Sequence, residues 1–208
     1  MVDLRDPVTG FQPAAGMLLL AGPRLTEPAF DGAVVLLLDH DGDGAVGVIL
    51  NRPTHTDLGE ALPPHALDGF GPAAPALRRA PVMEGGPVDQ SQLLALVRWQ
   101  PGWLEMDERR RRVLPGTGLV DLLGLASSGE GAIDPAWRGA DVRAYAGYAG
   151  WGPGQLEAEI ADEAWFVLPA GSEDPFAPAP ESLWRDAVDR QPGRLSWLWL
   201  RPADVALN

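Results

Sequence analysis

The segment from residue 147 to residue 157, Gly-Tyr-Ala-Gly-Trp-Gly-Pro-Gly-Gln-Leu-Glu, constrains the fold more than any other part of the chain. Its four glycines permit backbone angles and close approaches that a Cβ atom would forbid. Pro153 suits the first position of a helix, where no N–H is required. The segment therefore predicts a strand that ends in a tight corner and opens directly into a helix. Such a corner brings backbone N–H groups and the side chains of Gln155 and Glu157 into one small region, which favours a site but identifies no reaction.

The composition excludes several classes of chemistry. The 208 residues contain no cysteine, which rules out disulfides, thiolate nucleophiles, iron–sulfur clusters and cysteine-based zinc sites. The chain also contains no lysine, so it has no P-loop lysine, Schiff-base lysine or anchor for pyridoxal phosphate. The three histidines show no metal-ligand spacing. The sequence therefore predicts neither a cofactor nor a metal site.

The charge of the chain argues against nucleic acid as a partner. A formal net charge of −13 repels phosphates, whose binding depends on basic contacts. The one basic cluster, residues 109–112, directly follows two acidic residues and is typical of a solvated loop or strand edge. The N-terminus lacks a signal-peptide pattern, and the apolar runs are too short to span a bilayer. We expect a soluble, cytoplasmic protein with no membrane association.

Short apolar runs between turn residues predict buried strands over residues 17–21, 33–38 and 46–50, with a hairpin connection at 39–44. Because these runs are continuously apolar rather than alternating, we expect both faces of their sheet to be covered. Further strands are predicted over residues 93–99, 142–148 and 164–168, and a last strand or apolar tail at 196–200. Helices are predicted over 119–126, capped by Thr117, over the apolar stripe that includes Leu156 and Ile160, and over 183–188. A single helical turn is predicted near 76–79. One α+β domain over residues 1–208, with its core at about 16–190, is the simplest account.

Three segments in a fixed order carry a resemblance to a known family. Residues 16–53 contain Gly-Met-Leu-Leu-Leu-Ala-Gly-Pro, then His40, then Gly-Ala-Val-Gly-Val-Ile-Leu-Asn-Arg-Pro. Gly-Gly-Pro follows at 85–87, and the 147–157 segment is followed by Trp165. Together these motifs resemble the YqgE/AlgH family of bacterial proteins.

The resemblance implies a single α+β domain in which a bifurcated, mostly antiparallel sheet curls into a pseudo-barrel flanked by a few helices. It implies little about activity, since the association of the family with transcriptional control rests on naming. The chain also departs from the family pattern at two positions: Val97 stands where members often carry a histidine, and Glu163 where many carry asparagine. If that histidine were catalytic, this protein would lack it.

His40 and Glu157 are the candidates for catalysis. His40 lies between two aspartates and either acts as a general base or caps a turn through backbone hydrogen bonds. Glu157 either acts as a general base or stabilises the positive end of the helix that begins beside it. No nucleophile motif accompanies either residue.

The candidates for binding share hydrogen-bonding side chains or glycine corners. They are Asn51, Arg52, Pro53, Gly85, Gly86, Trp151, Gln155 and Glu157. Our preferred hypothesis is a non-enzymatic binding, interaction or regulatory protein in which these residues form a groove for a small molecule or a partner peptide. The alternative is a hydrolase or transferase that uses His40 or Glu157 as a general base. A third hypothesis, a direct DNA-binding regulator, fits the naming of the family but not the charge.

Overall fold

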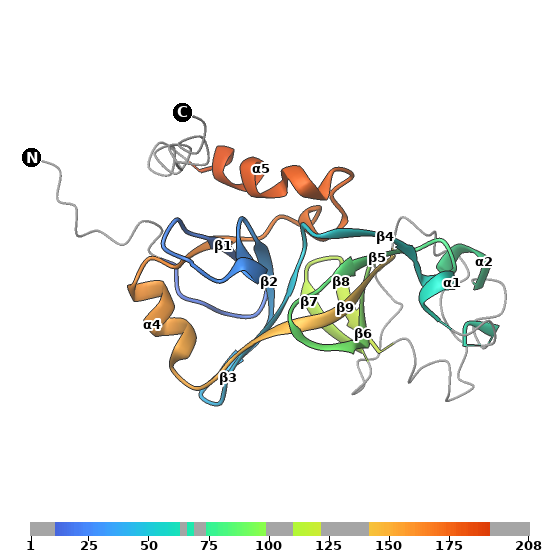
Figure 1. Ribbon diagram of the computed structural model, residues 1–208, viewed down its shortest axis with the longest axis horizontal. Helices are drawn as coiled ribbons and strands as arrows, with labels where there is room; N and C mark the ends of the chain where they lie inside the picture. Colours follow the sequence, from blue (N-terminus) through green and yellow to red (C-terminus); the bar gives the residue numbers. More distant parts are fainter. Residues whose placement is uncertain (1–10, 63–65, 69–73, 99–109, 122–141, 192–208) are drawn as a thin grey trace, which may run out of the picture.

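The computed structural model describes residues 11–62, 66–68, 74–98, 110–121 and 142–191 (Figure 1). Within these ranges ten strands form one sheet. The strands are β1 (Met17–Ala21), β2 (Val34–Asp41), β3 (Gly44–Ile49), β4 (Pro53–Asp57), β5 (Pro81–Glu84), β6 (Val88–Arg98), β7 (Arg110–Leu114), β8 (Thr117–Val120), β9 (Val142–Trp151) and β10 (Trp165–Pro169). The helices are α1 (Leu58–Ala61), α2 (Ala74–Leu77), α4 (Gln155–Ala161) and α5 (Leu183–Asp189), with 3₁₀ turns η1 (Pro28–Phe30), η4 (Asp174–Phe176) and η5 (Pro180–Ser182).

Strand β9 is the point at which the sheet divides. Its last residues, 149–151, pair with β3, whereas residues 142–146 pair with β6 on one side and residues 144–146 pair with β5 on the other. The β5–β9 pairing is parallel and the remaining pairings are antiparallel. The main path runs β10-β1-β2-β3-β9-β6-β8-β7 and curls into a half-barrel (Figure 1). These observations confirm the mostly antiparallel, bifurcated α+β fold.

The curl brings the end strand β7 back to β2. The register of β2 shifts between Leu37 and Asp39, which leaves Leu38 at a bulge. The guanidinium of Arg111 on β7 donates to the carbonyl oxygen of Leu38 at 2.8 Å and to the carboxylate of Asp39 at 2.7 Å. The carbonyl oxygen at the bulge thereby accepts a hydrogen bond from a residue of the last strand in the sheet order.

The buried side chains of the described residues form three hydrophobic clusters, and helices cover both faces of the sheet. Alternate residues of β1 and β2, such as Leu18 and Leu36, pack in a cluster that includes Leu183 and Ala187 of α5. Their neighbours pack in a second cluster, which includes Leu156 of α4. Helices α4 and α5 therefore lie on opposite sides of these strands (Figure 1). The third cluster lies under α1 and α2 at the other end of the molecule. The expectation that both faces are covered is confirmed.

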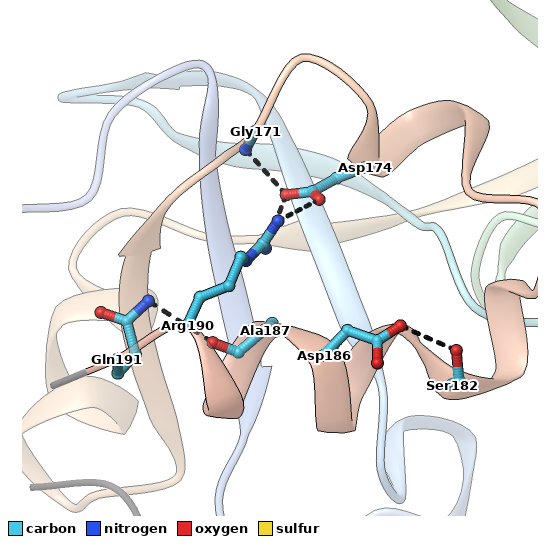
Figure 2. Close-up of polar contacts among 7 residues, drawn as sticks. All are labelled: Gly171, Asp174, Ser182, Asp186, Ala187, Arg190 and Gln191. Carbon is cyan, nitrogen blue, oxygen red and sulfur yellow. Dashed lines mark hydrogen bonds and ion pairs between the residues drawn. The ribbon is translucent and has the colours of Figure 1, made fainter. Parts of the chain in front are cut away.

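The segment after β10 is tied down before and after α5, as Figure 2 shows. Asp174 is only 4 % exposed, and its carboxylate accepts from the Gly171 N–H at 2.7 Å and from two nitrogens of Arg190 at 2.6 and 2.9 Å. The indole N–H of Trp184 donates to the carbonyl oxygen of Ala21 in β1 at 3.2 Å. These bonds fix the position of α5 on the sheet.

Two expectations from the sequence need correction. Residues 117–120 form strand β8 rather than the start of a helix, because they pair with β6 on one side and β7 on the other; the rest of the expected helix lies outside the described residues. The hairpin connection is also shorter than expected, since β2 continues through Asp41 and the turn consists of Gly42 and Asp43 alone. The segment 196–200 lies outside the described residues as well.

Candidate functional site

The loop between β1 and β2, residues 22–33, is held by residues that are distant in the sequence. In this β1–β2 loop, Phe30 packs against Trp165 of β10 and Trp151 at the end of β9, with ring centroids 5.5 and 6.3 Å away. The two tryptophan rings are themselves 5.8 Å apart in an edge-to-face arrangement. All three side chains are buried. Trp151 therefore contributes to the core rather than presenting its ring to a ligand.

The carboxylate of Glu159 on α4 holds this aromatic cluster in place. One of its oxygens accepts from the indole N–H groups of Trp151 and Trp165, both at 2.9 Å. The other accepts from the amide of Gln155 at 2.8 Å, and the amide oxygen of Gln155 accepts from the Gly152 N–H at 3.0 Å. Sequence reasoning missed Glu159. Its position four residues after Gln155, on the same side of the helix, was the available signal.

Asn51 and Arg52 hold the other end of the β1–β2 loop. The Asn51 side chain accepts from the Val34 N–H and donates to the Gly32 carbonyl oxygen, both at 2.8 Å. Arg52 donates to the carbonyl oxygen of Asp31 at 2.7 Å. Both side chains thus bind main-chain atoms of the loop. Pro53 begins β4, is exposed, and pairs with Met83 of β5.

Gly85 and Gly86 are buried where β5 meets β9. A Cβ atom on Gly85 would overlap the carbonyl oxygen of Gly147, and one on Gly86 would overlap the main chain of Tyr148. These glycines are needed for the close approach of two backbones. They are not open to a ligand.

His40 and Glu157, the two catalytic candidates, contact each other. The Nε2 atom of His40 lies 2.7 Å from an oxygen of Glu157, which joins the end of β2 to the first turn of α4. The side chain of His40 is 19 % exposed and that of Glu157 is 51 % exposed. A hydrogen bond from the backbone N–H of Glu157, followed by the one from His40, lowers the pKa of the Glu157 carboxyl. A histidine oriented by a carboxylate suits a general base, and the same contact also serves as a structural link between β2 and α4.

The structure therefore divides the predicted site residues into separate groups. One group, at or just before the start of α4, consists of Trp151, Gln155 and Glu157. Trp151 pairs with the beginning of β3, whereas Asn51 and Arg52 come just after the end of β3. Trp151 contacts the β1–β2 loop through Phe30, and Asn51 and Arg52 contact the other end of this loop. They do not line one common groove.

Two hollows lie beside the β1–β2 loop, one on each side. The larger, about 470 Å³, which we name the α5 hollow, is lined by Gly32, Glu181, Ser182, Trp184 and Arg185. The smaller, about 380 Å³, the α4 hollow, is lined by Arg24, Leu25, Thr26, Glu27, Glu159, Asp162 and Ala164. Sequence reasoning missed the α5 hollow, because nothing local connects Gly32 to α5.

Two kinds of feature are absent from the described ranges. Within them no three or more His, Asp or Glu side chains gather closely enough to hold a metal ion. No helix among the described residues has the length and apolar character needed to cross a membrane.

Comparison with known proteins gives a consistent picture. A family model described as AlgH-like matches residues 18–196. A UPF0301 protein of Streptomyces avermitilis is 41 % identical over 196 residues, which covers 93 % of this chain and 94 % of the relative. A UPF0301 protein of Thermobifida fusca is 40 % identical over 200 residues, with the same two shares covered.

Two solved structures are similar in fold. The crystal structure of a Corynebacterium diphtheriae protein is 25 % identical, with a TM-score of 0.71, and the match covers 94 % of this chain and 98 % of that one. The solution structure of the AlgH protein from Pseudomonas aeruginosa is 26 % identical, with a TM-score of 0.61 and coverage of 91 % and 96 %. The names of these relatives specify no ligand or reaction.

Proposed function

This chain belongs to the AlgH-like family, and on that premise we propose that it is a cytoplasmic, non-enzymatic binding protein that holds a small molecule or a peptide segment in the α5 hollow. The observation that carries the proposal is the hollow itself. Its volume of about 470 Å³ falls within the range of small-molecule sites. Its walls are a braced loop on one side and an anchored helix on the other.

The bracing of both walls supports binding. Asn51 and Arg52 hold the Asp31–Gly32 turn, and the Asp174–Arg190 pair with the Trp184 indole N–H holds α5. Walls that are already fixed lose little conformational entropy when a ligand binds. Asn51 and Arg52, which the sequence predicted to bind a ligand, thus contribute to the α5 hollow by fixing the β1–β2 loop beside it.

The arrangement of the catalytic candidates supports a role without turnover. His40 and Glu157 are paired with each other, and neither lines the α5 or the α4 hollow. Arg111, from the basic cluster, is engaged by Asp39 and Leu38. These contacts favour a small molecule or a protein over nucleic acid as the partner.

The test is a thermal-shift screen of the purified protein against metabolites, nucleotides and peptides. A ligand that binds only the folded state adds about 2.7 kcal/mol at a hundred times its dissociation constant, which raises the melting temperature. We expect a hit that disappears in Ser182→Trp, which fills the hollow, and persists in the matched control Ser172→Trp at an exposed loop position. Hits that survive Ser182→Trp unchanged would contradict the proposed site.

The 2.7 Å contact between His40 and Glu157 favours one second candidate, a hydrolase or transferase with His40 as the base. In that case a screen of ester, amide and phosphoester substrates would show turnover that His40→Gln abolishes without loss of the fold. Turnover that His40→Gln leaves intact would rule this candidate out.

A further inference from the structure

We propose that the outer edge of β10 is a docking surface for the protein's own C-terminal segment, and that residues 195–200 bind there antiparallel to β10 as one more strand of the sheet. This surface is independent of whether the α5 hollow binds a ligand. Three observations support it: backbone groups of β10 that lack partners among the described residues, the place where α5 ends, and the sequence that follows α5.

The backbone groups of β10 point in two directions. Among the described strands β10 ends the sheet, and it pairs with β1 on one side only. The N–H of Gly22 donates to the carbonyl oxygen of Ala164 at 2.7 Å, so Ala164 and every second residue after it direct their backbone groups toward β1. The residues between them direct theirs away from β1; they are Trp165, Val167 and Pro169. Because proline has no N–H, two N–H groups and three carbonyl oxygens face outward.

These outward groups lack partners among the described residues, although the strand is buried. No described residue forms a hydrogen bond with the outward backbone atoms of Trp165 or Val167. The two residues are nevertheless only 1 % and 0 % exposed. A buried backbone N–H or carbonyl oxygen without a hydrogen bond is costly and rare in folded proteins. We therefore expect the partner of this edge beyond the described residues, in the same chain or in another molecule.

Helix α5 ends beside the carboxyl end of β10 (Figure 2). Arg190, directly after the helix, donates to the buried carboxylate of Asp174, which also accepts from the N–H of Gly171. Gly171 comes two residues after Pro169, the last residue of β10. A Cβ atom on Gly171 would lie 3.1 Å from a guanidinium nitrogen of Arg190. A segment that continues from this point along β10 must therefore run antiparallel to it.

The sequence that follows α5 suits this position. Pro192-Gly193 favours the end of the helix, and the run Leu-Ser-Trp-Leu-Trp-Leu occupies residues 195–200. Because β10 has 5 residues, this run is long enough to pair along its whole length. The side chains of β10 alternate between the cluster that contains Leu183 of α5 and the one that contains Leu156 of α4. A strand beside β10 would continue the layer between these helices, which favours a run that is apolar at nearly every position.

Charge favours the protein's own segment over a second copy of β10 as the occupant. An antiparallel strand over residues 195–200 would end near Trp165, and the next residue is Arg201. Asp162 and Glu163, just before β10, place two negative charges at that end, and Arg24 reaches only the Glu163 carboxylate, at 3.4 Å. Arg201 would bring a second positive charge to this pair. A second copy of β10, Trp-Phe-Val-Leu-Pro, contains no charged residue.

The experiment is NMR on the full chain, in a mixture of isotope-labelled and unlabelled protein that separates contacts within one molecule from contacts between two. We expect nuclear Overhauser effects between backbone protons of residues 195–200 and of β10 within one molecule, and slow hydrogen exchange of the Trp165 and Val167 amides. Effects between two molecules would assign the edge to a second copy. Their absence between residues 195–200 and β10 would assign it to another segment or another protein. Either result would overturn the inference.

Proline variants measure what the pairing contributes. Successive residues of a strand direct their N–H groups to opposite sides, so one of Trp197→Pro and Leu198→Pro removes a donor that faces β10. We expect that variant to speed exchange of the two outward amides of β10 about tenfold more than that of the amides facing β1. The control Val205→Pro, outside the run, should leave all of these rates unchanged.

Outward amides that exchange alike in both proline variants and in the control would contradict the pairing. If a proline variant does not fold, the nuclear Overhauser effects in the unchanged chain still decide between the protein's own segment and another occupant.

Discussion

The two glycine corners of this protein look alike in sequence and differ in physical cause. At the β5 corner, Gly85 and Gly86, an added Cβ would overlap main-chain atoms of β9. At the α4 corner, Gly152 to Gly154, nothing lies within 4 Å of a Cβ on Gly154 and only the Gln155 side chain, at 3.9 Å, approaches one on Gly152. Gly154 instead has φ +72°, in the left-handed region. Gly85 is needed for space and Gly154 for a backbone angle, whereas Gly86, with φ +152°, meets both requirements.

The largest effect is expected at the β5 corner. Gly85→Ala should cost about 3 kcal/mol of unfolding free energy, because the carbonyl of Gly147 belongs to a paired strand and cannot move aside. Urea unfolding measures it. The control Gly42→Ala, in the hairpin turn with open space around it, should stay within about 0.5 kcal/mol of wild type. Equal stabilities for the two variants would refute the difference between the corners.

Glu159→Gln probes what holds the α4 corner in place. The amide oxygen can still accept from both tryptophans, but these two bonds lose their charge assistance and the amide nitrogen then faces the donor Nε2 of Gln155, at a cost of about 2 kcal/mol. Chemical unfolding followed by tryptophan emission reports both the stability and the environment of the rings. Glu84→Gln, an exposed change of the same kind, is the control. An unchanged unfolding midpoint for Glu159→Gln would show that the carboxylate does not anchor the cluster.

Gly154→Ala isolates the backbone angle from any steric overlap. We expect a loss of about 1 kcal/mol, the usual cost of a left-handed conformation for a residue with a Cβ. Thermal unfolding measures it. A cost as large as that of Gly85→Ala would mean that the α4 corner is also limited by space.

Glu163, just after α4, tests the same backbone effect by the opposite change, because here a side chain is removed from a left-handed position. It has φ +59°, and the Ala164 N–H bonds to the Glu159 carbonyl oxygen, as in a Schellman cap. Glu163→Gly should therefore stabilise the protein by up to about 1 kcal/mol, less the small contribution of its exposed ion pair with Arg24. A matched melting experiment on Arg24→Ala separates the two contributions. Destabilisation by Glu163→Gly beyond that of Arg24→Ala would contradict the argument from the backbone.

The smallest effect is expected from pH. The pKa of Glu157 is lowered from 4.5 in the folded protein, so its stabilising contribution is present above that value and is lost as the pH falls through the lowered one. Because the carboxyl is half exposed, we expect less than about 1 kcal/mol. Unfolding free energies measured between pH 7 and pH 3 should fall less steeply in Glu157→Gln than in wild type. A parallel decline in the two proteins would show that the hydrogen bonds from the Glu157 backbone N–H and from His40 to this carboxylate contribute nothing to stability.

The family, the fold class and the main strands could be predicted from the sequence because they depend on local signals. Apolar runs locate β1, β2 and β3, and Gly-Pro-Gly before Gln155 locates the start of α4. The Thr117 segment shows the limit of such signals. The apolar spacing of this segment favours a helix, but its pairing with β7 and with β6, about twenty residues earlier in the chain, stabilises a strand instead.

The sequence by itself determined which residues are unusual: the glycine corners, Asn51, Gln155 and the His40–Glu157 candidates. Only the tertiary structure decided what each one does. Asn51 and Gln155 bind the protein itself, and the α5 hollow joins Gly32 to residues 181–185 across about 150 positions of chain. The physical reason is that hydrogen-bond partners and cavity walls are set by how the sheet curls and where α5 is anchored, and no local pattern records either.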